Sequence, residues 1–104
     1  MEAPPALVQV LERSRALGFL GPGPVGAHIA HAGAFLTALD GVTGTVVDLG
    51  SGGGVPGLVI GALRPDLRLV LLDAMAKRCA FLREAVGSLG LDAEVLEGRA
   101  EELG

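Results

Sequence analysis

The sequence has few of the residues on which disulfide-bonded, metal-binding and polyanion-binding proteins depend. Cys79 is the single cysteine among 104 residues, which excludes a disulfide framework and a cysteine-rich zinc site. His28 and His31 have no acid or thiol beside them, so we expect no metal site. The net charge of −4 offers no bulk attraction to nucleic acid. Because no basic segment precedes an apolar core at the start, as in a signal peptide, we expect a cytoplasmic protein.

Formal charge is missing from one long stretch, residues 16–39, and this raises the question of a membrane span. A transmembrane helix needs about 20 mostly apolar residues, and the stretch is long enough. The Gly-Pro-Gly-Pro sequence at 21–24, however, divides it into two short pieces, and further glycines interrupt both. We therefore expect no membrane association.

Apolar periodicity predicts two helices followed by three strands that alternate with two further helices. The segment 68–73 is apolar on both faces, which is typical of an interior strand of a parallel sheet. The β-branched run at 45–49 is also expected to be a buried strand. Strands that alternate with helices favour right-handed crossovers and a parallel sheet covered by helices. The full set comprises helices over 4–17, 24–39, 56–64 and 75–89 and strands over 45–49, 68–73 and 93–97.

Apolar stripes on these helices predict which residues face the core. Spacings of three and four residues define one face of a helix. Gly18 and Gly90 follow the first and last helices at positions suited to a left-handed cap. The expected stripes include Leu7, Val10, Leu11 and Leu17, then Val25, Ile29, Ala32, Leu36 and Leu39, and finally Met75, Cys79, Leu82, Val86 and Leu89.

Five glycines occur among the eight residues from 50 to 57, directly after the first predicted strand. Each glycine costs conformational entropy on folding, so this density favours a loop whose backbone approaches a ligand where a Cβ atom would collide. The following helix adds unpaired N–H groups at its N-terminus. A merely flexible turn is the alternative, and the strand before the loop and the helix after it argue against that alternative.

Two acids bracket this loop and indicate the chemistry of its ligand. Gly52–Gly57 fits the pattern G-x-G-x-x-G, and Asp73 follows Gly52 by 21 positions, so an NAD-dependent oxidoreductase is one interpretation. Asp48, however, would repel a pyrophosphate and would suit a cationic amino group. S-adenosylmethionine suits both acids, because it carries an ammonium, a sulfonium and a ribose but no phosphate. Capping of a neighbouring loop is the alternative role for Asp48.

Four separated blocks of the sequence resemble the glucose-inhibited division protein B family, methyltransferases that modify guanine N7 in small-subunit (16S) ribosomal RNA. The resemblance implies an α/β, Rossmann-like class I methyltransferase fold, S-adenosylmethionine as cofactor and ribosomal RNA as partner. It also implies a helical segment over 1–42 ahead of a partial cofactor-binding domain over 43–104. The blocks, which recur in order within Thr45–Leu103, are Asp48–Gly57, Leu71–Ala74, Lys77–Arg83 and Gly98–Glu102.

The residue pattern and the resemblance together define a cofactor site in which no side chain is expected to be a catalytic acid, base or nucleophile. Guanine N7 has a free lone pair and loses no proton, so methyl transfer from a sulfonium needs positioning rather than acid–base help. By the resemblance, Asp73 takes the ribose, and Ala100 and Glu101 lie beside the adenine. The cofactor-site residues are Asp48, Gly50, Ser51, Gly52, Gly54, Val55, Asp73, Ala74, Ala100 and Glu101.

Three basic residues are candidates for contact with RNA. Lys77, Arg78 and Arg83 fall on the helix that follows Asp73, and cations on this helix could meet phosphates of the substrate. A solvated outer helix face is the alternative, and the net acidic balance of the chain favours it.

Class I methyltransferase domains have more strands than the three predicted here, so we expect an incomplete domain without C-terminal strands. The first strand is central in the doubly wound order. Without a neighbour on one side, the strand at 45–49 would expose an apolar edge through which the chain could self-associate. An inactive, self-associating remnant is therefore a third interpretation of function.

Overall fold

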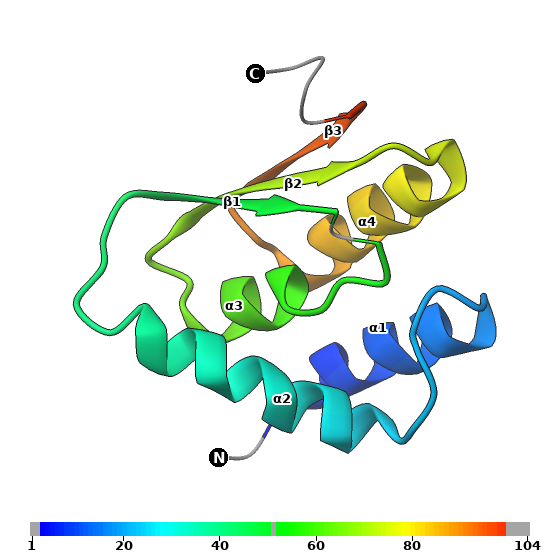
Figure 1. The fold of residues 1–104 in the computed structure, drawn as a ribbon, viewed down its shortest axis with the longest axis horizontal. Coiled ribbons are helices and arrows are strands. Elements are labelled where there is room, and N and C mark those ends of the chain that lie inside the picture. The colour runs from blue at the N-terminus through cyan, green and yellow to red at the C-terminus, as the bar shows by residue number, and fades with distance from the viewer. Residues whose placement is uncertain (1–2, 51, 100–104) are drawn as a thin grey trace.

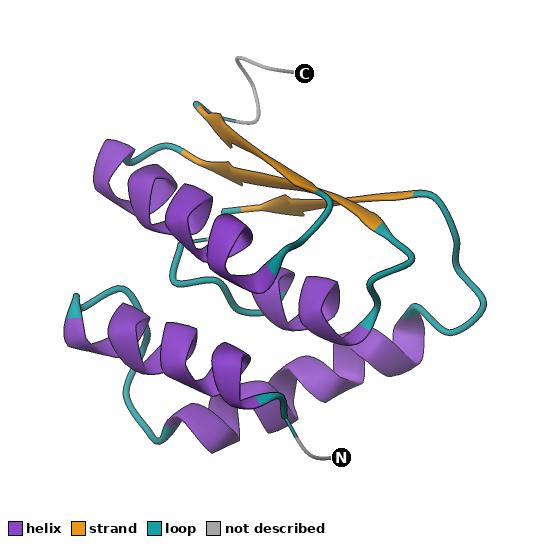
Figure 2. Cartoon of the chain, turned by 180° about the vertical axis from the view of Figure 1, so that it is seen from behind, coloured by secondary structure: helices purple, strands orange, loops and turns teal. Residues whose placement is uncertain are grey.

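The chain folds into a sheet with helices stacked against one of its faces (Figure 1). The computed structural model describes residues 3–50 and 52–99. The elements in chain order are α1 (Pro5–Ala16), α2 (Val25–Ala38), β1 (Thr45–Leu49), α3 (Gly57–Leu63), β2 (Arg68–Asp73), α4 (Ala76–Leu89) and β3 (Ala93–Glu97). Helices α3 and α4 lie directly beneath the sheet, and α1 and α2 pack beneath those two helices (Figures 1 and 2). In the described part of the chain, the other face of the sheet carries no helix.

The sheet is parallel, in the order β1-β2-β3, and the predicted strand boundaries are those observed. The central strand β2 is buried as predicted. The prediction that 45–49 is buried is wrong, because β1 lies at an edge of the described sheet and only one of its faces meets the helices. Val47 and Leu49, on the uncovered face, are 54% and 63% exposed.

Helix α1 ends in the left-handed glycine turn that the sequence predicts. Gly18 has a φ of +79°, and the N–H of the following residue donates to the Ser14 carbonyl at 3.0 Å, as in a Schellman cap. The buried stripe of α1 consists of Leu7, Leu11 and Ser14, at i, i+4 and i+7. Leu17, predicted on the apolar face, is 47% exposed, because this C-cap residue lies beside the stripe rather than on it.

All four helices begin one residue later than predicted, α1 included, whose N-cap is Pro4. Pro24, Pro56 and Met75 each stand at the N-cap of α2, α3 and α4 instead of in the first turn. Met75 is 47% exposed as a result, which corrects its assignment to the buried stripe of α4. Cys79 is fully buried, as predicted.

One hydrophobic core joins the helices to the sheet. Leu7 of α1 and Ala32 of α2 belong to the same buried cluster as Leu58 of α3, Leu71 of β2 and Leu82 of α4. The N-terminal helical segment therefore packs on the sheet domain through a shared core rather than through a separate one. No helix within the described residues has both the length and the hydropathy that crossing a bilayer requires.

Candidate functional site

The glycine loop lies at the carboxyl ends of β1 and β2, the edge where open α/β sheets bind ligands. Gly50 N–H donates to the Leu72 carbonyl at 2.8 Å, which ties the start of the loop to β2. Gly50 and Gly54 have φ angles of +77° and +98°, which glycine adopts without strain. The loop therefore has a defined backbone conformation that depends on glycine.

Three glycines of this loop, Gly53, Gly54 and Gly57, are required by the protein's own packing; a Cβ atom on Gly54 would collide with the Leu58 side chain. A Cβ atom on Gly53 would collide with the Phe19 carbonyl oxygen, which belongs to the turn after α1. A Cβ atom on Gly57 would lie 2.5 Å from Asp48 Oδ2 and 2.7 Å from Leu71 Cδ2. These positions hold glycine because other segments of the chain fill the space, and not because a ligand needs it.

Gly50 and Gly52 are the loop positions at which the ligand interpretation fits. A Cβ atom on Gly50 would meet nothing within 4 Å, and one on Gly52 would have only ordinary contacts, the nearest at 3.7 Å. The backbone at these positions therefore faces space in which a ligand can approach. This is the part of the site whose shape fits a cofactor.

Asp73, at the end of β2, is held directly under the loop. Its carboxylate accepts hydrogen bonds from Gly52 N–H at 2.8 Å and from Met75 N–H at 2.9 Å. The side chain is only 5% exposed. Because a carboxylate oxygen has more than one acceptor position, the group retains capacity to accept further bonds from a ligand hydroxyl. Asp73 is thus a fixed, acceptor-only group beside Gly52.

Arg78 lies next to Asp73. Its Nη1 atom is 3.8 Å from Asp73 Oδ2. Arg78 belongs to the first turn of α4, where a cation interacts unfavourably with the helix dipole. The ion pair with Asp73 offsets that disadvantage. Lys77 and Arg83 are exposed, and Arg83 Nη2 donates to the Val95 carbonyl at 3.4 Å. The basic residues named as RNA contacts therefore divide into one beside the cofactor site and two on the outer surface.

Asp48 lies on the helix-facing side of β1. Its Oδ2 atom is shielded from solvent and points toward Gly57, at the start of α3. The residue also borders a cavity of about 180 Å³ between α2, β1 and α3, together with Phe35 and Ile60. The carboxylate thus stands beneath the α3 end of the loop, whereas Asp73 stands beneath the Gly52 end.

The remaining predicted site residues have less informative positions. Gly54 is buried, Val55 is half-buried and Ala74 is exposed. Among the described residues, no cluster of three histidine, cysteine or acidic side chains is arranged to hold a metal ion. Ser51, Ala100 and Glu101 lie outside the described residues.

Two side chains that support the site were missed from the sequence. Ser14 of α1 is fully buried and donates to the Gly53 carbonyl at 2.8 Å. Cys79 Sγ donates to the Asp73 carbonyl at 3.3 Å, and burial raises the pKa of this thiol, which keeps it protonated as a donor. The position of Ser14 at i+7 from Leu7 on the apolar stripe was the available signal, since a hydroxyl there must find a buried partner.

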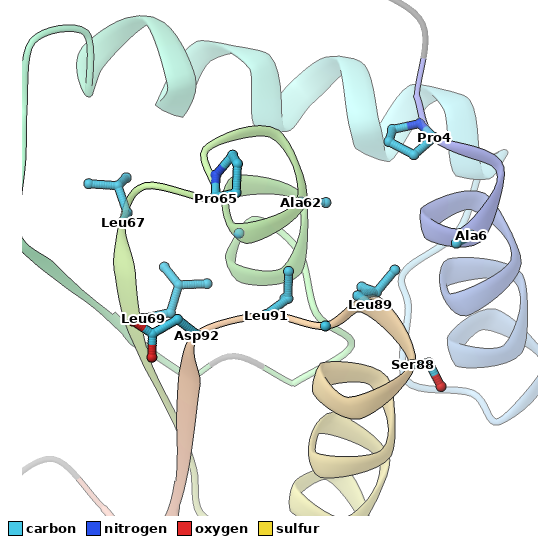
Figure 3. Close-up of a pocket in the computed structure, with 12 residues that line it drawn as sticks. Pro4, Ala6, Ala62, Pro65, Leu67, Leu69, Ser88, Leu89, Leu91 and Asp92 are labelled. Atoms are coloured by element: carbon cyan, nitrogen blue, oxygen red, sulfur yellow. The ribbon is translucent and has the colours of Figure 1, made fainter.

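A second cavity, of about 210 Å³, lies at the opposite end of the strands (Figure 3). It is bordered by the starts of β2 and β3, with Leu67 and Asp92, and by the beginning of α1, with Pro4. None of the predicted cofactor residues that the structure describes borders it. Because ligands of open α/β sheets bind at the carboxyl ends of the strands, this cavity is not the candidate site.

Comparison with solved structures identifies the fold. A crystal structure of a protein described as an O-methyltransferase from Klebsiella pneumoniae matches 99% of this chain and 47% of that chain. The TM-score is 0.75 and the sequence identity is 24%. The arrangement of strands and helices is therefore that of a Rossmann-like methyltransferase fold.

Comparison with sequences identifies the family. A ribosomal RNA small subunit methyltransferase G of Acidothermus cellulolyticus is 46% identical over 91 residues, which cover 83% of this chain and 40% of that protein. The protein of the same description from Mycobacterium leprae (strain TN) is 60% identical over 58 residues, or 56% of this chain and 24% of that protein. The chain thus spans between about a quarter and two fifths of these relatives. Because the family model of rRNA small subunit methyltransferase G also matches residues 25–104, this chain belongs to that family.

Proposed function

We propose that this chain forms the cofactor-binding part of an S-adenosylmethionine-dependent methyltransferase that acts on guanine N7 of small-subunit ribosomal RNA. Membership of the family supports the reaction class. The observation that carries the proposal for this chain is the bond from Gly52 N–H to Asp73 Oδ2, at 2.8 Å across 21 residues. It joins an open stretch of glycine backbone to a fixed carboxylate, which is a site for a ligand with hydroxyl donors.

The residues present fit S-adenosylmethionine. Gly50 and Gly52 offer backbone that a ligand can approach, and Asp73 offers acceptors for the ribose hydroxyls. Asp48 is the proposed partner of the cationic amino end, on the α3 side of the loop. When bound, the cofactor supplies a methyl group on an activated sulfonium. The task of these residues is to orient it, because guanine N7 has no proton to lose.

The RNA substrate is expected to meet the surface beside α4. Lys77 and Arg83 are exposed there and are suited to phosphate contacts, which position a nucleic acid without reading its sequence. Arg78 reaches the same region from its ion pair with Asp73, so it lies between the proposed cofactor and the proposed RNA surface. The proposed ribosomal RNA substrate supports a cytoplasmic location, which is part of the proposal.

Titration calorimetry of the chain with S-adenosylhomocysteine tests the proposal. We expect measurable binding, and we expect Asp73→Asn to weaken it by about 1–3 kcal/mol, because hydrogen bonds to a charged acceptor are lost. Asp92→Asn is the matched control, since Asp92 pairs with Arg68 at the opposite end of the strands, at 2.9 Å. Equal affinity of the Asp73→Asn variant and the original chain would reject the assignment of Asp73. Stronger binding of NAD in the same titration would favour the oxidoreductase interpretation instead.

A second proposal concerns the uncovered face of the sheet. We propose that two copies of the chain associate through β1 and its exposed face, on which Val47 and Leu49 are 54% and 63% exposed. An edge strand offers unpaired backbone groups, and apolar side chains beside it favour association.

A further inference from the structure

We infer that Ser14 is a positioning residue for the glycine loop, and that α1 thereby sets the backbone conformation that the cofactor would meet. The match to the family model begins at residue 25, so α1 and Ser14 lie outside it. The inference rests on the proposed function, because it assigns the loop a ligand. It adds a role for a helix that neither the glycine pattern nor the match to the family model includes.

The contact between α1 and the loop is direct and buried. Ser14 is fully buried, and its Oγ donates to the Gly53 carbonyl at 2.8 Å, although the two residues are 39 positions apart. A Cβ atom on Gly53 would lie 3.0 Å from Ser14 Oγ and would collide with the Phe19 carbonyl. The end of α1 therefore fits against bare backbone at Gly53, and no other residue type leaves room for it.

The acceptor that Ser14 uses shows what its hydroxyl does. A buried serine within a helix commonly donates to the carbonyl four residues earlier in the same helix. Ser14 instead donates to a loop carbonyl in a different part of the fold. The hydroxyl is therefore used to hold the loop, since bonding within α1 would have satisfied it without any contact to Gly53.

Fixing this carbonyl fixes the amide that follows it in the same peptide plane. A carbonyl and the following N–H point in opposite directions across a trans peptide bond, and the cis peptide bond of the described residues is Val55–Pro56. Holding the Gly53 oxygen on the α1 side therefore directs the Gly54 N–H away from α1. On the other side, Gly52 N–H donates to Asp73 Oδ2 at 2.8 Å. A continuous series of contacts thus runs from Ser14 through the backbone of Gly53 and Gly52 to Asp73.

Helix α1 is itself anchored on the element that follows Asp73. The rings of Phe19 and Phe81 meet edge-to-face with centroids 5.9 Å apart, which joins the turn after α1 to α4. Arg13 Nε lies 3.3 Å from Glu84 Oε1, also on α4. Leu11 fixes α1 in the core. A helix held this way can position the loop, because it does not move independently of the strand end that carries Asp73.

Hydrogen exchange of the free chain tests the inference without any ligand. In Ser14→Ala we expect the amides of residues 52–58, apart from Pro56, which has no N–H, to exchange about fivefold faster. This is the size expected for loss of one buried hydrogen bond, and the amides of 69–72 in β2 should be unchanged. Ser14→Cys preserves the size of the side chain with a much weaker donor, so it should behave like Ser14→Ala. Thr37→Ala is the control, since it removes a hydroxyl that donates to Gly33 within α2, at 3.2 Å.

Calorimetry with S-adenosylhomocysteine then asks whether the position of the loop matters for binding. We expect Ser14→Ala and Ser14→Cys to weaken binding about fivefold and Thr37→Ala to leave it unchanged. Equal exchange across 52–58 in all variants, or faster exchange spread evenly over 69–72 as well, would overturn the inference. If the original chain binds no S-adenosylhomocysteine, the proposed function fails, and the exchange data still decide whether Ser14 holds the loop.

Discussion

Gly57 shows how one residue in this loop depends on three separate segments. It begins α3, yet the space beside its Cα atom is filled by Asp48 of β1 and Leu71 of β2. A methyl group there would have to displace a shielded carboxylate oxygen or a core leucine. Glycine at this position therefore allows α3 to pack closely on the sheet and keeps Asp48 in place.

We predict that Gly57→Ala destabilises the chain by about 1–3 kcal/mol, because added atoms in a filled core cost roughly that much. Gly87→Ala is the matched change, since Gly87 lies within α4 and its Cβ atom would meet nothing within 4 Å. Alanine there should stabilise the chain by about 0.5–1 kcal/mol. Denaturant unfolding of both variants measures the contrast. A Gly57→Ala variant as stable as the original would show that the space beside Gly57 can open.

At the residue level, the sequence was informative where chemistry is local and uninformative where it depends on distant contacts. Asp73 could be predicted because its spacing from Gly52 is a property of the chain itself. The reason why position 53 must be glycine could not be predicted, because the atoms that would obstruct a Cβ atom there belong to Phe19 and Ser14, which are remote in sequence. The glycine-rich pattern thus predicts a site, but it does not separate the glycines that face a ligand from those that face the protein.

At the level of elements, Arg64 connects the end of α2 to the turn before β2. Its Nη1 donates to the Leu39 carbonyl at 3.0 Å and its Nη2 to the Val42 carbonyl at 2.7 Å. The same guanidinium holds Asp66 through two hydrogen bonds, of 2.9 and 2.8 Å. Carbonyls at the end of α2 and just beyond it therefore gain a donor that α2 itself cannot provide.

We predict that this connection weakens in acid. The hydrogen bond from Arg64 lowers the pKa of Asp66 below its ordinary value of 3.8, so the charged carboxylate is favoured in the folded state. Its contribution is complete above the unfolded pKa and is lost as the pH falls through the folded one. Between about pH 5 and pH 2, the original chain should therefore lose more stability than Asp66→Asn. In an Arg64→Gln background, Asp66→Asn should make no difference to the acid dependence of unfolding.

The elements themselves were the most predictable level of this fold. The three strand boundaries follow from apolar and β-branched runs that end at turn residues, and they coincide with those observed. Helix starts were predicted one residue early, because Pro24, Pro56 and Met75 occupy N-caps. The role of Arg64 could not be predicted, since its partners at and after the end of α2 are 25 and 22 residues away in sequence.

At the level of the whole molecule, the helices leave the two faces of the sheet unequal (Figures 1 and 2). Val47 pairs with Val70, and Leu49 with Leu72, so apolar side chains lie next to one another across the uncovered face. The sequence predicted an exposed edge at 45–49 from the strand order, but it treated the strand itself as buried. Burial depends on what covers a strand, and the run of apolar residues alone does not reveal that.

We predict that the uncovered face causes concentration-dependent dimerisation, which sedimentation velocity can measure. Leu49→Lys places a charge on the uncovered face at the end of β1, beside its open edge, so this variant should remain monomeric at concentrations where the original chain dimerises. Leu17→Lys is the matched control, because Leu17 is 47% exposed on α1, in the helical layer that lies away from the sheet. It should dimerise like the original chain, since its charge lies far from the proposed contact. A monomeric original chain at every concentration, or equal loss of dimer in both variants, would contradict association through the sheet.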